Sequence, residues 1–385
     1  MKYRKFGDLG FDVSTFGVGC MRLPLKVQPD GTTDRTKIDE EEAIKMIRHA
    51  IDSGVNYIDT AYPYHGGASE LLVAKALKDG YREKVKLATK LPVWLTNSYE
   101  DFERILDEQL AKLEVETIDF YLLHSLSKDR WEHIKEMGVL DFLDKAVESG
   151  KIKYPGFSFH DDLPVFKDII DSYDWKMCQI QLNILDENHQ AGLEGLRYAG
   201  SKGIPVVIME PLRGGKLAHN VPKDVAELWN QFEVKRSPVE WAFRWLYNFP
   251  EVTVILSGVS TMEQLKDNLE IFSKDDAVAN SMSNEELELV KKVQAQYESK
   301  IKVGCTACDY CMPCPSGVDI PGTFALYNDF SMFEGSQDYK DRYQSFIEDG
   351  KDASNCVECG QCESECPQHI SIIEKLKEAH AALTS

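Results

Sequence analysis

The sequence has little that would suit a membrane, an exported protein or a nucleic-acid surface. No apolar run approaches the ~20 residues needed to span a bilayer, and the first ten residues, MKYRKFGDLG, lack the apolar core of a signal peptide. Basic residues are outnumbered, since 44 Lys and Arg against 64 Asp and Glu give a formal net charge of −20. Phosphate surfaces repel such a chain, so we expect no nucleic-acid or membrane partner and a cytoplasmic location.

Also missing are low-complexity tracts and a G-x-G-x-x-G motif after the first predicted strand, the signature of a Rossmann domain. Instead, short apolar runs alternate with amphipathic stretches of helical spacing. Eight such runs begin at Ser14, Asn56, Val85, Ile118, Ile152, Met177, Ile204 and Val252. Eight β–α units in about 250 residues predict an α/β fold of the closed (β/α)8 TIM-barrel type, with an open doubly wound sheet as the alternative.

The composition changes close to residue 280. Ser281 to Ser283 precede NEELELVKKVQAQYESK, a pattern that predicts a capped helix leaving the barrel. A cysteine-rich segment and a polar, aromatic-dotted stretch follow. We therefore expect a barrel domain over residues 1–280 and a small, mainly helical domain over residues 281–385.

Four polar side chains lie at the ends of predicted strands or just beyond them: Asp59, Tyr64, Lys90 and His124. Each alone is also typical of a helix cap, a packed ring or a solvated charge. Because the carboxyl ends of barrel strands meet at one rim, we expect the four to converge. There an ammonium would lower the pKa of a phenol, a carboxylate would hold the ammonium, and an imidazole would orient a carbonyl. The set predicts protonation of a carbonyl as hydride arrives.

Six stretches of the chain together resemble the aldo-keto reductases, specifically the branch with a C-terminal ferredoxin-like iron–sulfur domain. The motifs that carry the resemblance are GVNYIDTAYPYHGGASE, LATKLP, IDFYLLHS, GKIKYPGFSFHD, MEPLRGGKL and SGVSTMEQLKDNLE. The resemblance implies a catalytic tetrad of Asp59, Tyr64, Lys90 and His124, with Tyr64 as general acid and base. It also implies a nicotinamide dinucleotide, NADP or NAD, bound across the barrel mouth.

The same resemblance assigns cofactor contacts. Ser158 and Gln179 would hold the nicotinamide carboxamide, and Met209 stands where an aromatic residue usually stacks on the ring. Pro211, Leu212, Gly214 and Lys216 would follow the pyrophosphate, and Gly258, Ser260, Gln264 and Asn268 the adenosine end. Three departures bear on this assignment: Met209 replaces the stacking aromatic residue, Phe159 replaces a frequent asparagine, and Gln264 stands where an arginine is common. The choice between NADP and NAD therefore stays open, with NADP favoured by the family.

Eight of the ten cysteines fall in the last quarter of the chain. They form C-x2-C-x2-C-x2-C-P at Cys305, Cys308, Cys311 and Cys314, and C-x2-C-x2-C-x3-C-P at Cys356, Cys359, Cys362 and Cys366. In two-cluster ferredoxins three cysteines of a run hold one cubane, and the fourth, before proline, ligates the other. We predict two [4Fe–4S] clusters with crossed ligation. Zinc, disulfides and a single cluster are the alternatives, and Cys20 and Cys178 are expected to be ordinary buried thiols.

The predicted function is reversible reduction of a small aldehyde or ketone with hydride from NAD(P)H, alongside clusters that serve electron transfer, with a redox partner protein, or structure. One alternative is an electron-transfer or nicotinamide-sensing protein whose barrel acts as a docking or regulatory module. Specificity in barrels resides in loops, here MRLPLKVQPDGTTDRTKID, WLTNSY and SLSKDRWEHIKEMG. These loops do not reveal the substrate.

Overall fold

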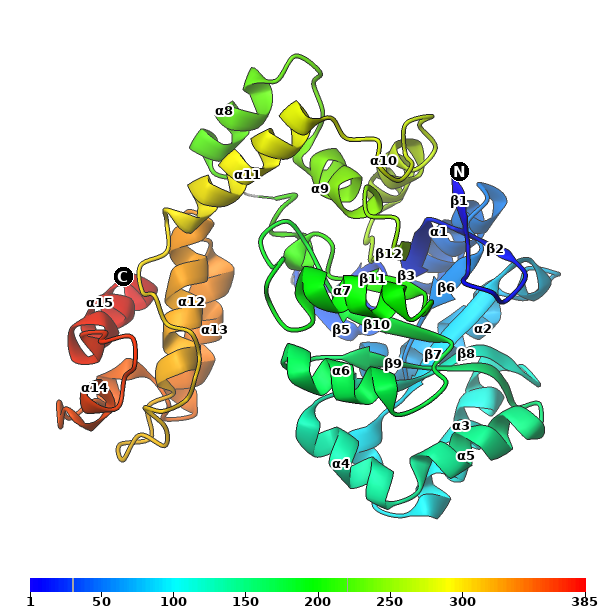
Figure 1. The fold of residues 1–385 in the computed structure, drawn as a ribbon, viewed down its shortest axis with the longest axis horizontal. Helices are drawn as coiled ribbons and strands as arrows, with labels where there is room; N and C mark the ends of the chain where they lie inside the picture. Colours follow the sequence, from blue (N-terminus) through cyan, green and yellow to red (C-terminus); the bar gives the residue numbers. More distant parts are fainter. Residues whose placement is uncertain (30, 220) are drawn as a thin grey trace. The chain divides into compact units, whose positions relative to one another are not determined.

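A computed structural model describes residues 1–29, 31–219 and 221–385. Its main feature is a closed barrel of parallel strands (Figure 1), in which β12 pairs with β3 to complete the circle. The barrel strands are β3 (Phe16–Gly19), β6 (Tyr57–Asp59), β7 (Lys86–Leu91), β8 (Ile118–Leu126), β9 (Ile152–Phe159), β10 (Met177–Gln181), β11 (Val206–Met209) and β12 (Val252–Ser257). Each of the eight predicted runs supplies one strand, so the TIM-barrel prediction is confirmed.

Helices follow the strands for reasons visible in the sequence. At the start of α1 (Glu40–Asp52) the Asp39 side chain accepts a hydrogen bond from the Glu42 amide, and three glutamates of the first turn favour the helix N-terminus. Gly54, with φ of +97°, takes the left-handed conformation just after the helix ends. The next helices are α2 (Ala68–Ala76), α3 (Tyr99–Leu113), α4 (Lys128–Glu136), α5 (Val139–Glu148), α6 (Leu163–Asp171), α7 (Gly192–Ser201), α8 (Lys223–Gln231), α9 (Pro238–Tyr247) and α10 (Met262–Ile271).

Two antiparallel hairpins stand outside the predicted pattern. One joins β1 (Tyr3–Lys5) to β2 (Asp12–Ser14), and the other joins β4 (Leu25–Val27) to β5 (Thr33–Ile38). The second hairpin lies in the stretch after β3 that the sequence analysis treated as a loop. Short 3₁₀ turns are found at Tyr64–Gly67, Arg82–Lys84, Val93–Leu95, Arg213–Gly215 and Ala353–Asn355.

The barrel interior is filled by side chains, as in a packed core. Phe6, Tyr57, Phe120, Met177 and Val254 belong to one buried cluster. Rings dominate it, and the centroids of Phe6 and Phe120 lie 4.6 Å apart. The interior is therefore not a channel, and polar chemistry is confined to the rim.

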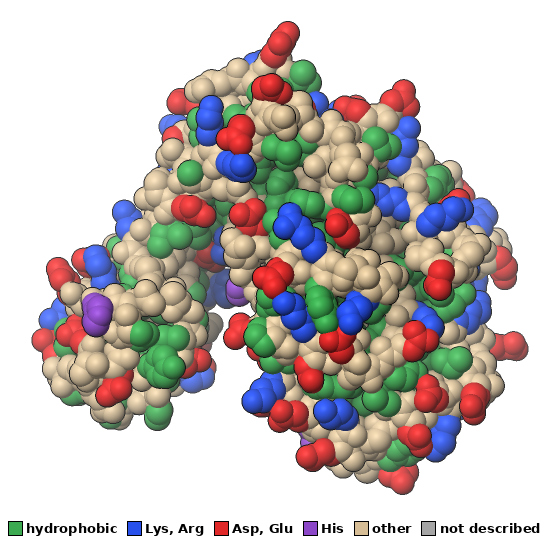
Figure 2. Space-filling model, viewed as in Figure 1, with side chains coloured by type: hydrophobic (Ala, Val, Ile, Leu, Met, Phe, Trp, Pro, Cys, Tyr) green, Lys and Arg blue, Asp and Glu red, His purple; other side chains and the backbone are tan. Residues whose placement is uncertain are grey.

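The chain separates into two compact units, Met1–Arg213 with Glu240–Ser283, and Gly214–Val239 with Asn284–Ser385. The second unit holds α8 and α11 (Asn284–Glu298), α12 (Ile320–Met332), α13 (Gln337–Glu348), α14 (Gln361–Ser364) and α15 (Ile372–Thr384). Acidic and basic side chains are interspersed over the face seen in Figure 2. Among the described residues, no helix is both long and apolar enough to cross a membrane.

Gly17 on β3 offers a test of barrel packing. A Cβ built there would lie 2.8 Å from Val254 Cγ1 and 2.9 Å from Leu256 Cδ2, closer than carbon atoms tolerate. We expect Gly17→Ala to lower the free energy of unfolding by about 1–3 kcal/mol through overpacking. Gly19→Ala on the same strand is the control, because its Cβ would meet nothing nearer than 3.7 Å. Urea titration of both variants checks this; equal stabilities would contradict the packing.

Candidate active site and cysteine clusters

A buried ion pair lies at the C-terminal rim of the barrel. Lys90 Nζ donates to both carboxylate oxygens of Asp59, at 2.7 and 2.8 Å, and to the carbonyl oxygen of Thr60 at 2.8 Å. The neighbouring strands β6 and β7 deliver the two residues, and both side chains are almost wholly buried. The structure thus brings together two of the four predicted site residues, Asp59 and Lys90.

Tyr64 and His124 complete the group. Lys90 Nζ lies 5.2 Å from the centroid of the Tyr64 ring, and the Tyr64 and His124 ring centroids are 6.0 Å apart, edge to face. Tyr64 begins the 3₁₀ turn after β6, whereas His124 stands near the end of β8. All four residues of the predicted tetrad therefore converge, although their catalytic roles stay predictions.

Burial and neighbouring charges shift the pKa values of Lys90 and Tyr64. Burial lowers the pKa of Lys90, but Asp59 and Tyr64 raise it more, so the ammonium stays charged. Burial raises the pKa of Tyr64, and Lys90 offsets only part of this, leaving the pKa above its ordinary value of 10.0. Lys90 thus lowers the phenol pKa, as the sequence predicted, but burial outweighs this effect. Tyr64 is a protonated phenol at neutral pH.

His124 is held neutral. Burial lowers its pKa well below 6.5, and the positive charges of Lys90 and Arg130 lower it further. Its Nδ1 atom is buried and accepts no hydrogen bond in the parts of the chain that the structure describes. A neutral imidazole has one N–H group, and this group can donate a hydrogen bond to a carbonyl oxygen.

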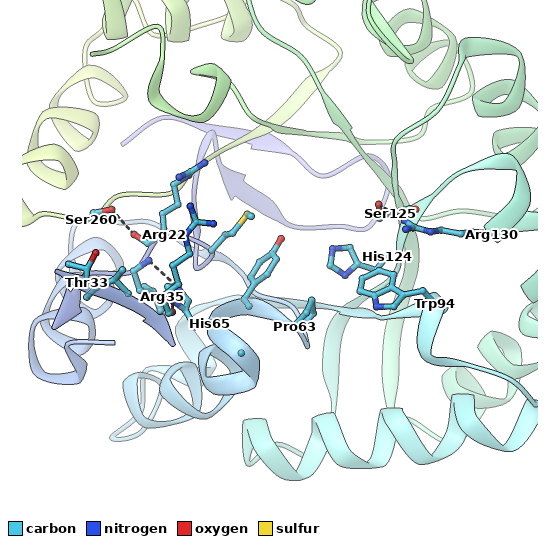
Figure 3. A pocket seen from close by; sticks show the side chains of 15 residues that line it. Arg22, Thr33, Arg35, Pro63, His65, Trp94, His124, Ser125, Arg130 and Ser260 are labelled. Carbon is cyan, nitrogen blue, oxygen red and sulfur yellow. Dashed lines mark hydrogen bonds between the residues drawn. The ribbon is translucent and has the colours of Figure 1, made fainter. Parts of the chain in front are cut away.

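Tyr64 and His124 line a pocket of about 810 Å³ (Figure 3). Its lining includes residues from each of the three loops expected to carry specificity: Arg22 and Arg35 from the first, Trp94 from the second and Arg130 from the third. Sequence reasoning did not single out the arginines. An arginine in a polar loop gives no sign of whether it faces solvent or a cavity, so the loops themselves were the only available signal.

Two predicted nicotinamide contacts lie on adjacent barrel strands. Ser158 on β9 and Gln179 on β10 are paired in register, and both are buried. Ser158 Oγ accepts a hydrogen bond from the Ser125 amide at 2.7 Å. Gln179 Nε2 approaches Met209 Sδ at 3.6 Å, while its Oε1 is buried without a hydrogen-bond donor in the described chain. An unpaired amide oxygen fits the predicted role, because a carboxamide NH2 would satisfy it.

The residues predicted for the adenosine end surround the start of α10. Thr261 caps the helix by accepting from the Gln264 amide, and Gln264 Oε1 accepts from the Ser260 amide at 2.9 Å. Gly258 and Ser260 are exposed, whereas Asn268 is buried and donates to Ser257 Oγ at 3.1 Å. A helix N-terminus suits a phosphate, but Asn268 acts here inside the fold.

The four residues predicted for the pyrophosphate divide between the two units. Pro211 and Leu212 belong to the first, Gly214 and Lys216 to the second. Within the second unit Lys216 Nζ pairs with Asp329 at 2.6 Å and lies 4.7 Å from the centroid of the Tyr339 ring. The ammonium of Lys216 is thus already neutralised by α12.

The eight clustered cysteines surround two small cavities in the second unit. Cys305, Cys308, Cys311 and Cys366 line one; Cys314, Cys356, Cys359 and Cys362 line the other. Most of them pack against a core that includes Val318, Phe324 and Leu376. Within the described residues no group of three or more His, Cys, Asp and Glu side chains is already arranged around a metal position. The grouping nevertheless fits two four-thiolate sites, the donor set of a cubane. As expected, Cys20 and Cys178 are buried elsewhere.

Comparison with protein families agrees with this two-part construction. Residues 17–292 match the aldo/keto reductase family, and residues 304–371 match a 4Fe-4S dicluster domain. The chain belongs to the aldo/keto reductase family and carries a C-terminal iron–sulfur domain. The resemblance drawn from the motifs is thereby confirmed.

Individual relatives are moderately similar. A probable aldo-keto reductase 1 of Glycine max is 36% identical over 162 residues, 40% of this chain and 44% of that protein. The uncharacterized oxidoreductase YqkF of Bacillus subtilis is 25% identical over 325 residues, 76% of this chain and 96% of the other. The match to the soybean protein thus leaves more than half of that protein uncovered.

Solved structures share the barrel. An aldo-keto reductase of Bacillus halodurans in its holo form superposes with a TM-score of 0.63 at 25% identity, covering 76% of this chain and 96% of that one. An aldo-keto reductase of Klebsiella pneumoniae in complex with NADP and acetate gives 0.59 at 22% identity, covering 76% and 95%. At this identity the second similarity establishes the fold alone.

The buried, neutral His124 has a consequence for stability. Its pKa is lowered on folding, so below about pH 6.5 the unfolded chain binds a proton that the folded chain does not. We expect wild type to lose up to about 1.4 kcal/mol of unfolding free energy per pH unit below 6.5, relative to His124→Gln. Denaturation between pH 7.5 and 5.5 checks this. Parallel pH dependences for the two proteins would contradict a neutral, buried imidazole.

Proposed function

We propose that the protein reduces an aldehyde or ketone to an alcohol with hydride from NAD(P)H, and catalyses the reverse reaction. The observation that carries this proposal is the convergence of four residues: Tyr64 and His124 line one pocket, and the Lys90–Asp59 ion pair lies beside Tyr64. Membership of the aldo/keto reductase family supports it. The bound nicotinamide would supply hydride to the carbonyl carbon.

The protein's own residues would manage the carbonyl oxygen. Tyr64, protonated because burial holds its pKa high, donates its proton to that oxygen as negative charge develops there. The Lys90 ammonium stabilises the phenolate left behind, and Asp59 keeps Lys90 charged and in place. Neutral His124 orients the carbonyl by hydrogen bonding.

For the cofactor we propose NADP or NAD, with NADP preferred. Ser158 and Gln179 fit the carboxamide of a nicotinamide, because a serine hydroxyl and an unpaired amide oxygen offer a donor and an acceptor. Ser260 and Gln264 lie at the start of α10, and a helix N-terminus suits the binding of a phosphate. Exposed Arg22 and Arg35 add positive charge at the same pocket.

Tyr64→Phe tests the proton donor. We expect kcat for carbonyl reduction to fall about 10²- to 10⁴-fold, because the acid is lost while the ring remains. Cofactor affinity, measured by fluorescence quenching, should stay within a few-fold of wild type. Tyr62→Phe is the matched control, since the Tyr62 hydroxyl bonds to Glu108 and the ring does not line the pocket. A Tyr64→Phe variant as fast as wild type would refute the assigned role.

For the second unit we propose two [4Fe–4S] clusters with crossed ligation. Each would take three cysteines of one run and the fourth cysteine of the other run, which fits the two cavities and their lining. The match to a dicluster domain supports the number two. The thiolates would hold clusters that exchange single electrons.

Double substitutions distinguish crossed from uncrossed ligation. Anaerobically purified wild type should contain about eight iron and eight acid-labile sulfide per chain. With crossing, Cys308→Ser with Cys366→Ser removes two ligands of one cluster and should leave about four iron. With crossing, Cys308→Ser with Cys314→Ser removes one ligand from each cluster and should leave almost no iron. Cys20→Ser is the control. The opposite pattern of iron loss would show that each run holds its own cluster.

A further inference from the structure

The pocket has one sign of charge. Three guanidinium groups line it, those of Arg22, Arg35 and Arg130, and no aspartate or glutamate lies among the described residues that line it. The chain as a whole carries a formal net charge of −20. A locally cationic cleft in an acidic protein concentrates anions and repels cations.

In Figure 3, Arg22 and Arg35 lie on one side of Pro63, the residue before Tyr64, and Arg130 lies on the other side, beyond His124. Arg22 and Arg35 gather with Thr33, His65 and Ser260 on one side, and Ser260 Oγ donates to the Arg22 carbonyl at 2.9 Å. Ser260 is one of the residues predicted to hold the cofactor. The charges on this side therefore suit the phosphates of a dinucleotide, which leaves the other side for the substrate.

Arg130 on α4 occupies that other side, next to His124. Its Nη1 donates to Ser125 O at 2.7 Å and to Ser125 Oγ at 2.9 Å, and its guanidinium carbon lies 5.2 Å from the centroid of the Trp94 ring. These contacts hold the guanidinium in one orientation. Within the described residues both of its side-chain hydrogen bonds use Nη1 and neither goes to a carboxylate, so its Nε and Nη2 donors stay available to a ligand.

Trp94 connects this arginine to the reacting groups. The Trp94 and His124 ring centroids are 5.1 Å apart, and 42% of the Trp94 surface is exposed. An exposed indole between a charged group and an imidazole offers an apolar surface to a short carbon chain. A molecule lying on it would reach Arg130 with one end and His124 and Tyr64 with the other.

We propose that the substrate is an anionic carbonyl compound, whose carboxylate or phosphate binds Arg130 while its carbonyl faces Tyr64 and His124. This assignment rests on the carbonyl reductase function proposed above and names its substrate class. A guanidinium fork binds either oxyanion through two parallel hydrogen bonds, stronger than neutral ones. Arg130 is thus a specificity-determining residue, and it takes no part in proton or hydride transfer.

Matched substrate pairs test the proposal with the intact holoenzyme. One pair is succinic semialdehyde and its methyl ester; a second is glyceraldehyde phosphate and glyceraldehyde. We expect kcat/KM to be about 10- to 100-fold higher for the anionic member of at least one pair, from its charge-assisted hydrogen bonds. Whichever pair shows the larger preference identifies the group as carboxylate or phosphate.

The variants separate binding from folding. Arg130→Gln should remove the preference, mainly by raising KM for the anionic aldehyde, and an unchanged circular dichroism spectrum reports an intact fold. Arg130→Lys should keep part of the preference. Arg104→Gln is the matched control, since Arg104 pairs with Asp101 and Glu108 outside the pocket. Arg35→Gln should raise KM for the cofactor and leave the preference between aldehydes unchanged.

The results of these experiments distinguish the proposed anionic substrate from the proposed carbonyl reduction. Equal kcat/KM for both members of each pair, or a preference that survives Arg130→Gln, would overturn the anionic substrate and leave carbonyl reduction standing. An anionic preference lost in Arg35→Gln instead of Arg130→Gln would overturn the assignment of the two sides. No turnover of any aldehyde, with Tyr64→Phe indistinguishable from wild type, would overturn both proposals.

Discussion

The arrangement of the barrel rim depends on the buried ion pair between Asp59 and Lys90. Moving two charges out of water costs several kcal/mol per ion, so such a pair persists only where geometry compensates both. Here the ammonium meets three oxygens between 2.7 and 2.8 Å. Its charge then raises the stability of a Tyr64 phenolate and lowers the pKa of His124. One ammonium thereby makes the tyrosine a better acid, and it adds to the burial that keeps the imidazole neutral.

The position of Lys90 is itself secured from outside the barrel. Side chains alternate along β7, so Lys90 faces the rim while its neighbour Thr89 faces the helices. Thr89 Oγ1 donates to Glu70 of α2 at 2.7 Å, and Gln109 of α3 bonds both to Glu70 and to the Lys90 carbonyl oxygen. A buried polar network works only when its members are paired. This one attaches two helices to the strand that carries the ammonium, and so connects tertiary packing to the acidity of Tyr64.

Much of this was accessible from the sequence, because periodicity and strand ends are local properties. Eight apolar runs predicted eight strands, and the strand-end rule predicted that Asp59, Lys90 and His124 would meet. The β4–β5 hairpin was missed, since TTDRTK is polar and lacks the alternation of a half-buried strand. The sequence predicted the effect of Lys90 on the Tyr64 pKa but could not give the net direction of the shift. It is the difference between burial and the field of Lys90, and a sequence shows which charges exist but not how much water remains around them.

The net charge of the whole chain also differs from the charge of a single pocket. A total of −20 argues against partners that carry extended negative charge, because repulsion over a large surface adds up. It says nothing about a concave site, where low-dielectric walls confine the field to the few groups that line it. Arg22 follows β3, Arg35 lies on β5 and Arg130 lies on α4, and they form a cationic pocket only when the barrel closes and sets these segments around one rim. The acidic surface elsewhere repels anions, so an anion gains most at this rim, where Arg22 and Arg35 suit the phosphates of the cofactor and Arg130 suits the anionic group of the substrate.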